Sequence, residues 1–209
     1  IAVSEKAIVS IINNLPTSCS ATGFPCKNFS GMNIFDAIAH SMTTLATGGY
    51  STRTASIGAF DSVVIEWVII AGMIVGSLPF AHYLAMARGG WRSLFHDPQV
   101  RWFLILIFGL VLTLSWHLMQ NGLGLGDALR QASFNGVSII TGTGYVSANY
   151  SSWGGFATTI LLIVMFIGGC GGSTTCGIKV FRLQVLAGTV KVQISRLLRP
   201  HAVVLAYYN

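Results

Sequence analysis

The chain has 209 residues, of which 53% are hydrophobic and only 9% are charged, and its formal net charge is +6. Because an average soluble domain carries roughly 25% charged residues, this composition excludes an ordinary soluble globular domain and indicates a membrane protein. The positive charge does not indicate nucleic-acid binding, since the basic segment 191–199 lacks the interleaved aromatic side chains of a base-stacking surface.

Residues 1–32 carry no clear structural signal and are interpreted as an N-terminal segment with an outer loop. Two cysteines, Cys19 and Cys26, stand in a short polar stretch of this segment. If that stretch faces an oxidising compartment, the sequence leaves open both a local disulfide and a pair of free thiols.

A helix too short to cross a bilayer is predicted for residues 33–46. Its apolar residues recur at helical spacing, and they are Ile34, Ile38, Met42 and Leu45. Asn33 and Asp36 supply capping groups at the first turn of this helix. The helix runs into a glycine turn, Thr47-Gly48-Gly49-Tyr50, where the partial negative charge of its carbonyl end favours a cation.

A second copy of this pattern follows. The segment 126–141 predicts another short helix, which runs into Gly142-Thr143-Gly144-Tyr145, so that Tyr145 follows Tyr50 by 95 residues. One such turn is an ordinary helix stop. Two turns in matching context favour re-entrant pore loops, because irregular backbone at membrane depth is tolerated only beside protein or a water-filled cavity. The carbonyl groups of such loops can replace the water shell of a cation.

Three apolar segments are candidate membrane spans: residues 63–87 after the first turn, 101–117, and 156–180 after the second turn. The first and the last are long enough for a hydrocarbon core of about 30 Å, and the middle one is borderline. Gly76 and Gly171 lie at equivalent places of the two copies, so we expect both long helices to break near mid-membrane. Close packing of helices through small residues is the alternative explanation of these glycines.

The glycine-rich run in the last segment also contains Cys170 and Cys176. No histidine or carboxylate accompanies these two cysteines in the sequence, so we interpret them as small buried residues rather than as a metal or redox site.

The basic residues lie in two regions of the chain, which the three apolar segments would place on the same side of the membrane. They are Arg88, Arg92 and Arg101 between the first two apolar segments, and Lys179, Arg182, Lys191, Arg196 and Arg199 after the last. By the positive-inside rule both regions are cytoplasmic, which puts both glycine turns near the outer face. We expect Glu66 and Arg130 near a membrane interface, and His82 as a buried, hydrogen-bonded side chain rather than a proton-coupling group.

Two segments carry a resemblance to a known family. One is Phe35-Asp36-Ala37-Ile38-Ala39-His40-Ser41 leading into the first turn, and the other is Phe166-Ile167-Gly168-Gly169-Cys170-Gly171-Gly172-Ser173-Thr174 leading into Gly177-Ile178-Lys179-Val180-Phe181-Arg182. Over residues 31–200 the chain resembles the membrane subunit of the Trk/Ktr/HKT superfamily of potassium transporters, and most closely the C-terminal half of its bacterial Trk-type potassium uptake members.

The resemblance implies an all-α integral membrane protein built of helix, re-entrant pore loop and helix repeats with broken second helices. Four such repeats surround one pore in this family, and the two visible here are similar to the third and fourth, which implies that the N-terminal half is missing. Residues 33–99 would form one repeat, 100–187 the next, and 188–209 a cytoplasmic basic tail. The second turn departs from the Thr-Ala-Gly-Phe more usual in the family.

The predicted function is translocation of K+, with Na+ as the alternative, without enzymatic activity and without an organic cofactor in this chain. The predicted filter residues are Thr47, Gly48, Gly49, Tyr50, Thr141, Gly142, Thr143, Gly144 and Tyr145. Within this set, four carbonyl groups would bind the ion, those of Thr47, Gly48, Gly142 and Thr143, and both tyrosines would support the loops from behind. A gate is expected at Gly76, Gly171, Gly172, Ser173 and Thr174, together with Arg182, which matches an arginine that helps to close the pore in the family.

The resemblance further implies a multi-pass homodimer in the lipid of the bacterial inner membrane, bound to a cytoplasmic nucleotide-binding regulatory subunit and not to nucleic acid. Two alternatives stay open: an ion-coupled secondary transporter, such as a symporter, with the same architecture, and a non-conducting structural subunit. A membrane-embedded enzyme is disfavoured, because the six acidic residues are scattered along the chain instead of converging.

Overall fold

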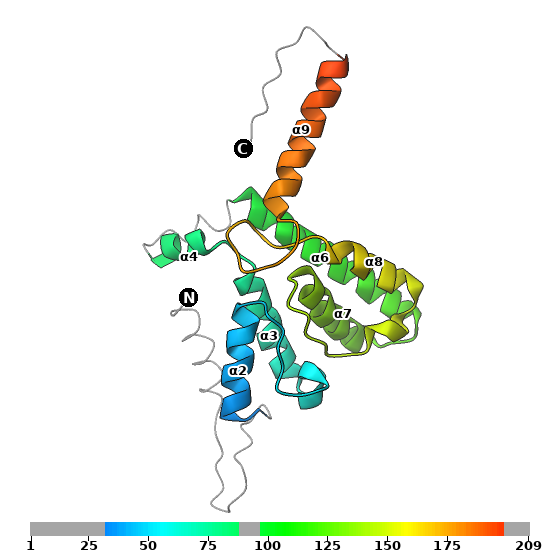
Figure 1. Ribbon diagram of the computed structural model, residues 1–209. Coiled ribbons are helices and arrows are strands. Elements are labelled where there is room, and N and C mark those ends of the chain that lie inside the picture. The colour runs from blue at the N-terminus through cyan, green and yellow to red at the C-terminus, as the bar shows by residue number, and fades with distance from the viewer. Residues whose placement is uncertain (1–31, 88–96, 199–209) are drawn as a thin grey trace, which may run out of the picture.

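The computed structural model describes residues 32–87 and 97–198, except for the side chain of Arg196. Within these ranges the elements are α2 (Ile34–Leu45), the short 3-10 helix η1 (Ser56–Phe60), α3 (Val63–Gly76), α4 (Phe80–Ala87), α6 (Pro98–Gln120), α7 (Leu125–Ile140), the 3-10 helix η2 (Tyr150–Trp153), α8 (Gly155–Met165) and α9 (Val180–Leu198) (Figure 1). The cysteines Cys19 and Cys26 lie outside the described residues.

The same order of elements occurs twice. A short helix, a glycine turn, a 3-10 helix and an apolar helix follow one another as α2, η1 and α3, and again as α7, η2 and α8. The two short helices predicted from the sequence are therefore confirmed, with bounds that differ from the predicted ones by a residue or so. The domain boundary predicted at residue 187 lies inside α9, which continues to Leu198.

The break predicted at Gly76 is present. Helix α3 ends there and α4 begins at Phe80, and the two helices meet at an angle of 96°. In the part of the chain that the structure describes, only α6 has by itself the length and hydropathy of a membrane span, and the bent pair of α3 and α4 passes the same test together. Gly76 packs against the end of α2, since a Cβ atom there would lie 2.9 Å from the carbonyl oxygen of Leu45.

The last apolar segment breaks earlier than predicted. Helix α8 ends at Met165, six residues before Gly171, and an irregular loop leads to α9. The base of this loop is closed by backbone hydrogen bonds from Ile178 to Phe166 and from Gly168 to Ile178, both of 2.9 Å. These bonds take up backbone groups that would otherwise continue the helix, which explains the early end. We call residues 166–179 the glycine-rich loop.

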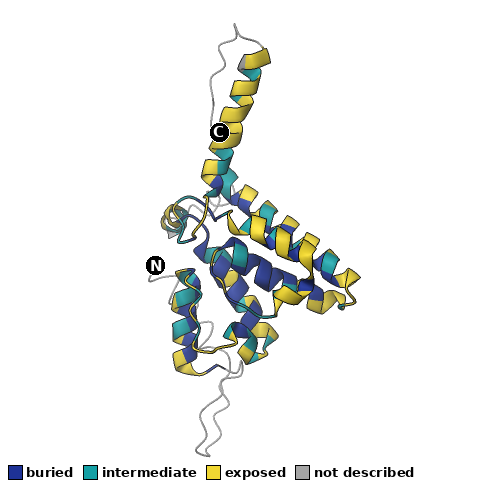
Figure 2. Cartoon of the chain, turned by 45° about the vertical axis from the view of Figure 1, so that its right-hand side comes forward, coloured by how far each residue is buried: buried dark blue, intermediate teal, exposed yellow. Residues whose placement is uncertain are grey.

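Helix α2 buries its polar face and exposes its apolar face, which is the reverse of a helix on the surface of a water-soluble domain. Its predicted apolar face is mostly exposed, with exposed fractions of 63% at Ile34, 45% at Ile38 and 53% at Met42. The polar residues on its other side are buried, and they are Asp36, His40, Ser41 and Thr44 (Figure 2). Asn33 stands at the N-cap without a side-chain capping bond, so the predicted capping role of its side chain is wrong. An apolar exterior around a polar interior fits a helix surrounded by lipid or by further protein.

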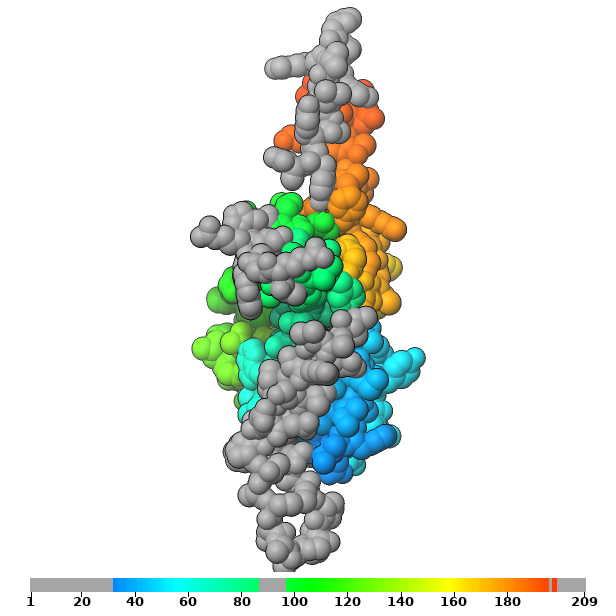
Figure 3. Space-filling model, turned by 90° about the vertical axis from the view of Figure 1, so that its left-hand side faces the viewer, coloured from blue at the N-terminus to red at the C-terminus, as the bar shows by residue number. Residues whose placement is uncertain are grey.

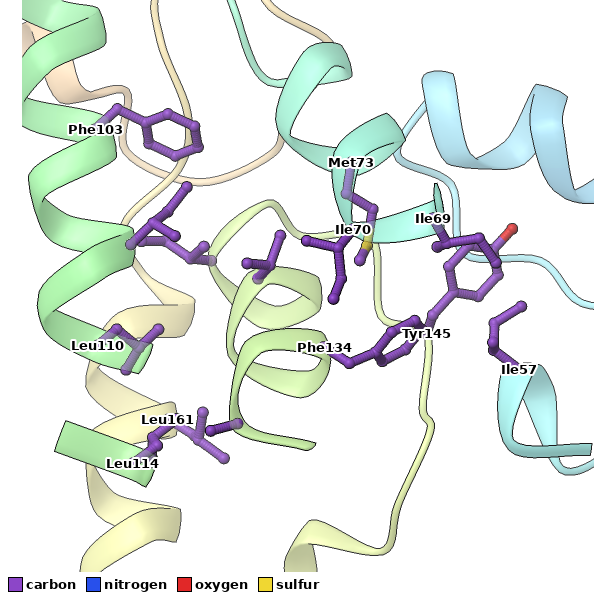
Figure 4. Close-up of a cluster of buried hydrophobic side chains, with 14 of the residues drawn as sticks. Ile57, Ile69, Ile70, Met73, Phe103, Leu110, Leu114, Phe134, Tyr145 and Leu161 are labelled. Atoms are coloured by element: carbon purple, nitrogen blue, oxygen red, sulfur yellow. The ribbon is translucent and has the colours of Figure 1, made fainter. Parts of the chain in front are cut away.

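Helix α7 packs between the helices on either side of it. Leu110 and Leu114 of α6 pack against α7 at Gly136, where a Cβ atom would lie 3.4 Å from each leucine side chain, and Phe134 of α7 faces α3 (Figure 4). Because lipid tails are as apolar as leucine, close packing rather than exclusion of water holds such helices together. The result is a fixed position of α7 between α3 and α6. Helix α9 projects from the opposite end of the molecule to α2 (Figure 3).

Candidate functional site

The two glycine turns have the same backbone shape. Thr47 and Gly49 of the first turn have φ angles of +48° and +66°, and Gly142 and Gly144 of the second have +68° and +83°, whereas the residue between them does not have a positive φ. Positive φ angles belong to the left-handed region of the backbone, which residues other than glycine rarely adopt. Where left-handed residues alternate with residues of negative φ, successive peptide groups face the same side of the chain. Each turn can therefore direct several carbonyl oxygens toward one point.

The two turns also touch each other through their backbones. A Cβ atom added to Gly49 would lie 1.7 Å from the carbonyl oxygen of Thr143, far inside any real contact distance. The neighbouring Gly48 is not restricted in this way, since its added Cβ would make only ordinary contacts, with the ring of Tyr50 at 3.5 Å and the carbonyl oxygen of Thr43 at 3.8 Å. Position 49 therefore requires glycine for two reasons, the φ angle and the contact with the second turn.

Each short helix holds its turn through a hydroxyl group seven residues before the tyrosine. The hydroxyl of Thr43 lies 3.1 Å from the carbonyl oxygen of Tyr50, and the hydroxyl of Ser138 donates to the carbonyl oxygen of Tyr145 at 2.7 Å. Thr43 and Ser138 are not among the site residues predicted from the sequence. Their shared spacing from the two tyrosines is the signal that could have found them.

The two tyrosines differ in their surroundings. Tyr145 is 1% exposed, and its hydroxyl lies 2.5 Å from the hydroxyl of Thr43 and 3.3 Å from the carbonyl oxygen of His40. Figure 4 shows its ring beside Ile57 of η1 and Ile69 of α3. Tyr50 is 79% exposed. Tyr145 is thus buried behind the turns, whereas Tyr50 is exposed in the described part of the chain, and the supporting role of the two tyrosines stays a prediction.

Polar side chains of the short helices also anchor the chain just after each turn. His40 Nε2 lies 2.9 Å from the hydroxyl of Ser51, and Asn135, at the equivalent position of α7, exchanges two hydrogen bonds of 3.3 Å with Ser147. Both His40 and Asn135 are almost completely buried. The turn and the residues after it are therefore fixed from the same helix in both copies.

Asp36 ties the first turn of α2 to the chain after the glycine turn. The hydroxyl of Thr52 donates to its carboxylate at 2.7 Å, and Arg53 Nη2 donates to the other oxygen at 3.1 Å. These bonds, chiefly the one from Thr52, outweigh burial and lower the pKa of Asp36. Asp36 therefore holds the start of α2 against the residues that follow the glycine turn.

Thr141 and Thr143 of the predicted filter are buried, and their hydroxyls lie 2.8 Å apart. The hydroxyl of Thr141 also donates to the carbonyl oxygen of Val137 at 2.8 Å. The side chains of the second turn thus bond to one another and to α7, which leaves the backbone carbonyls as the groups available to a ligand.

The glycine-rich loop lies directly against the inner ends of the turns. The hydroxyl of Thr174 lies 3.1 Å from the carbonyl oxygen of Leu45, 3.0 Å from that of Gly76 and 3.3 Å from the hydroxyl of Thr47. Further along, an added Cβ on Gly142 would contact Cys176 at 3.5 Å. The structure thus places Thr174 of the predicted gate against Thr47 of the predicted filter, and Gly76 against Leu45 just before that turn.

The loop is also tied to the break after α3 and to α6. The amide of Cys170 donates to Ser77 at 3.2 Å, and that of Phe80 donates to the carbonyl oxygen of Gly172 at the same distance. The amide of Gly171 donates to Gln99 Oε1 at 3.1 Å. Both interrupted helices therefore share one hydrogen-bonded assembly below the turns.

Within the loop, Lys179 Nζ donates to the carbonyl oxygen of Ser173 at 3.2 Å and also contacts Thr175. Cys170 is buried as expected, but Cys176 is exposed, so the interpretation of both cysteines as buried residues is wrong for Cys176. Arg182 is exposed at the start of α9. Its role as a gate residue stays a prediction.

Three ion pairs of the described residues lie away from the turns. Glu66 of α3 accepts from Arg130 of α7 at 3.1 Å, and this bond joins the first copy to the second. Arg130 also contacts Asp127 at 3.2 Å. On the other side of the break, His82 of α4 lies 2.6 Å from Asp97 and is partly buried, in keeping with a hydrogen-bonded histidine.

Comparison with known proteins identifies relatives of the whole arrangement. The sequence model of the TrkH family, described as cation transport proteins, matches residues 8–206. The Trk system potassium uptake protein TrkI of Halomonas elongata is 38% identical over 180 residues, which cover 86% of this chain and 37% of the relative. TrkH of Escherichia coli is 37% identical over 182 residues, covering 84% of this chain and 37% of the relative.

Among solved structures, the crystal structure of the potassium transporter TrkH from Vibrio parahaemolyticus is similar with a TM-score of 0.78 and 36% identity. The match covers 83% of this chain and 38% of that chain. The chain thus spans less than half the length of these relatives.

Proposed function

The chain belongs to the TrkH family of cation transport proteins, and on that premise we propose that its two glycine turns form part of a filter through which K+ crosses the membrane. The observation that carries this proposal is the repeated backbone shape of the turns, left-handed at Thr47 and Gly49 and again at Gly142 and Gly144. A repeated irregular backbone with carbonyls available on one side fits a site where a cation exchanges water for peptide oxygens.

The ion would be bound by backbone carbonyls of Thr47, Gly48, Gly142 and Thr143. Helices α2 and α7 both end at their turns and direct the partial negative charge of their carbonyl ends toward this position, which stabilises a cation there. The hydroxyl groups of Thr43 and Ser138 would hold the loops rigid from behind. A rigid loop matters because a filter distinguishes ions by the number and the spacing of its oxygens.

The glycine-rich loop would act as the gate below this filter. The hydroxyl of its Thr174 lies between the first turn at Thr47 and the break at Gly76, beside the backbone bonds that join the loop to Ser77 and Phe80. A typical hydrogen bond contributes only about 1 kcal/mol, so the loss of one of them would already favour movement of the loop. Arg182 would repel cations whenever it faced the passage.

The setting that we propose is a dimer in the bacterial inner membrane, with the turns near the outer face and α9 on the cytoplasmic side, where a nucleotide-binding regulatory subunit would dock. The exposed Lys191 on α9 and the basic residues near it support this orientation. The ion-coupled alternative is supported by the same 96° break between α3 and α4, since broken helices also serve secondary transporters.

Flux measurements on the purified full-length protein in liposomes test the proposal. Entry of K+, Rb+ and Na+ is measured in turn, with and without an opposing proton or sodium gradient. We expect K+ and Rb+ to enter much faster than Na+. A gradient of H+ or Na+ that drives K+ uphill would select the coupled transporter, and absence of flux of all three ions would refute ion translocation.

A further inference from the structure

The side chain of Lys179, the last residue of the glycine-rich loop, turns back onto the loop itself. Its ammonium group donates to the carbonyl oxygen of Ser173 at 3.2 Å and to the carbonyl oxygen of Thr175. The hydroxyl oxygen of Thr175 lies 3.3 Å from the same Nζ atom. Three oxygen atoms of two neighbouring loop residues thus surround one positive charge.

Only uncharged oxygen atoms hold this positive charge. None of the ion pairs in the described part of the chain includes Lys179. The lysine is half-buried, and Thr175 is only 4% exposed, so the contact is partly shielded from water. Carbonyl oxygens that take the place of water around a cation are also the ligands of K+ in selectivity filters. The ammonium group and K+ share the same charge and the same kind of ligand.

The oxygen atoms around Nζ are also held by bonds that do not involve the lysine. The amide of Gly169 donates to the hydroxyl of Thr175 at 3.0 Å, and this hydroxyl lies 2.8 Å from that of Ser173. The Ser173 hydroxyl donates in turn to the carbonyl oxygen of Cys170 at 2.7 Å. These bonds leave the carbonyl oxygens of Ser173 and Thr175 to the cation. The ligand set therefore belongs to the fold of the loop and not to the lysine alone.

The site adjoins the inner end of the first glycine turn. The two residues whose carbonyls hold Lys179 flank Thr174 in the sequence. The hydroxyl of Thr174 lies 3.3 Å from that of Thr47 and 3.0 Å from the carbonyl oxygen of Gly76. A cation bound by the loop would therefore lie next to the segment that joins the loop to the predicted filter.

We propose that the oxygens of Ser173 and Thr175 form a second binding site for a monovalent cation, in which the ammonium of Lys179 is a tethered occupant that K+ replaces when the side chain moves away. A divalent ion does not fit this ligand set, because calcium and magnesium sites as a rule contain carboxylates. The choice of K+ among monovalent ions rests on the proposed function. The alternative is a lysine that merely fastens the loop, and it predicts that no ion binds when the lysine is removed.

Lys179→Met in the full-length protein tests the site, because methionine keeps an unbranched apolar stem and removes the ammonium. Crystals of the variant and of the wild type are grown with Rb+, whose anomalous scattering locates bound ions. We expect Rb+ in contact with the carbonyls of Ser173 and Thr175 in the variant and no ion there in the wild type. Lys191→Met, on the exposed surface of α9, is the matched control and should leave the loop without Rb+.

Thermal unfolding in detergent gives a second measurement. With N-methylglucamine as the only added cation, Lys179→Met should unfold at a lower temperature than the wild type, because two carbonyls lose their partner. Replacement of N-methylglucamine by K+ at equal ionic strength should remove most of this difference, since an ion that binds the native state stabilises it. Lys191→Met should follow the wild type in both solutions. If the methionine variant does not fold, Lys179→Gln, which is also uncharged, takes its place.

The outcomes separate this inference from the proposed function. A folded, uncharged variant without Rb+ at the loop overturns the inference, and so does a difference in unfolding temperature that K+ leaves unchanged. Rb+ at the glycine turns but not at the loop would leave the filter standing while this site failed. Rb+ at the loop of a variant that binds none at the glycine turns would support this site and contradict the proposed filter.

Discussion

The hydroxyl of Tyr145 lies 2.5 Å from the hydroxyl of Thr43, which stands 102 residues earlier in the chain. Thr43 in turn lies 3.1 Å from the carbonyl oxygen of Tyr50. One side chain of the second turn thus reaches the residue that fixes the first turn. The two turns form one mechanical unit, and a change in either should alter the geometry of both.

Tyr145→Phe tests this link. The variant keeps the ring and its burial but removes the hydroxyl, so we expect the protein to lose about 1 kcal/mol of stability and to discriminate less well between K+ and Na+. Thermal unfolding in detergent and flux ratios in liposomes measure the two effects. Thr189→Val on α9 removes an exposed hydroxyl that bonds only within its own helix and is the control. An unchanged K+/Na+ ratio in Tyr145→Phe would contradict the proposed link.

Adjacent glycines give a second prediction. In Gly49→Ala the new methyl group would overlap the carbonyl of Thr143 at a φ of +66°, so we expect K+-selective flux to be abolished. Gly48→Ala meets only ordinary contact, and position 143 of the second copy already carries a side chain, so this control should retain most of the flux. Initial rates of Rb+ uptake at equal protein density provide the measurement. Equal loss in both variants would show that the clash with Thr143 is not the cause.

The sequence predicted the repeat, both short helices and the break at Gly76, because glycine spacing and helical periodicity are local properties. It did not predict which face of α2 is buried. Periodicity finds an apolar stripe and assigns it to the interior, but a bilayer reverses that choice and leaves Ile34 outside and His40 inside. The difference between Tyr50 and Tyr145, and the position of Thr174 below the first turn, depend on contacts between distant segments that no spacing encodes.

Thr174→Val tests the attachment of the glycine-rich loop. Valine preserves the shape but cannot bond to the carbonyls of Leu45 and Gly76, so the loop loses these two contacts and keeps its backbone bonds to Ser77 and Phe80. A loss of about 1 kcal/mol corresponds to roughly a fivefold shift toward the open loop, and basal K+ flux should rise by a similar factor. Ser173→Ala is the control, since the Ser173 hydroxyl bonds within the loop. Flux that stays equal to wild type would argue against a gate at this contact.

The ion pair between Glu66 and Arg130 gives the last prediction, because it is a charged link between α3 of the first copy and α7 of the second. The Glu66 side chain is only 6% exposed, and its second carboxylate oxygen has no hydrogen-bond partner among the described residues. Arg130→Met should therefore cost about 3 kcal/mol, since it leaves a buried carboxylate unpaired. Replacement of both Glu66 and Arg130 by methionine should restore most of that lost stability. Asp127→Asn is the control: the Asp127 side chain in the second ion pair of Arg130 is 62% exposed, so this variant should change stability by less than about 1 kcal/mol. The measurement is the unfolding midpoint of the three variants in detergent. A double variant as unstable as Arg130→Met would mean that the lost stability comes from the missing packing of the arginine and not from the unpaired charge of Glu66.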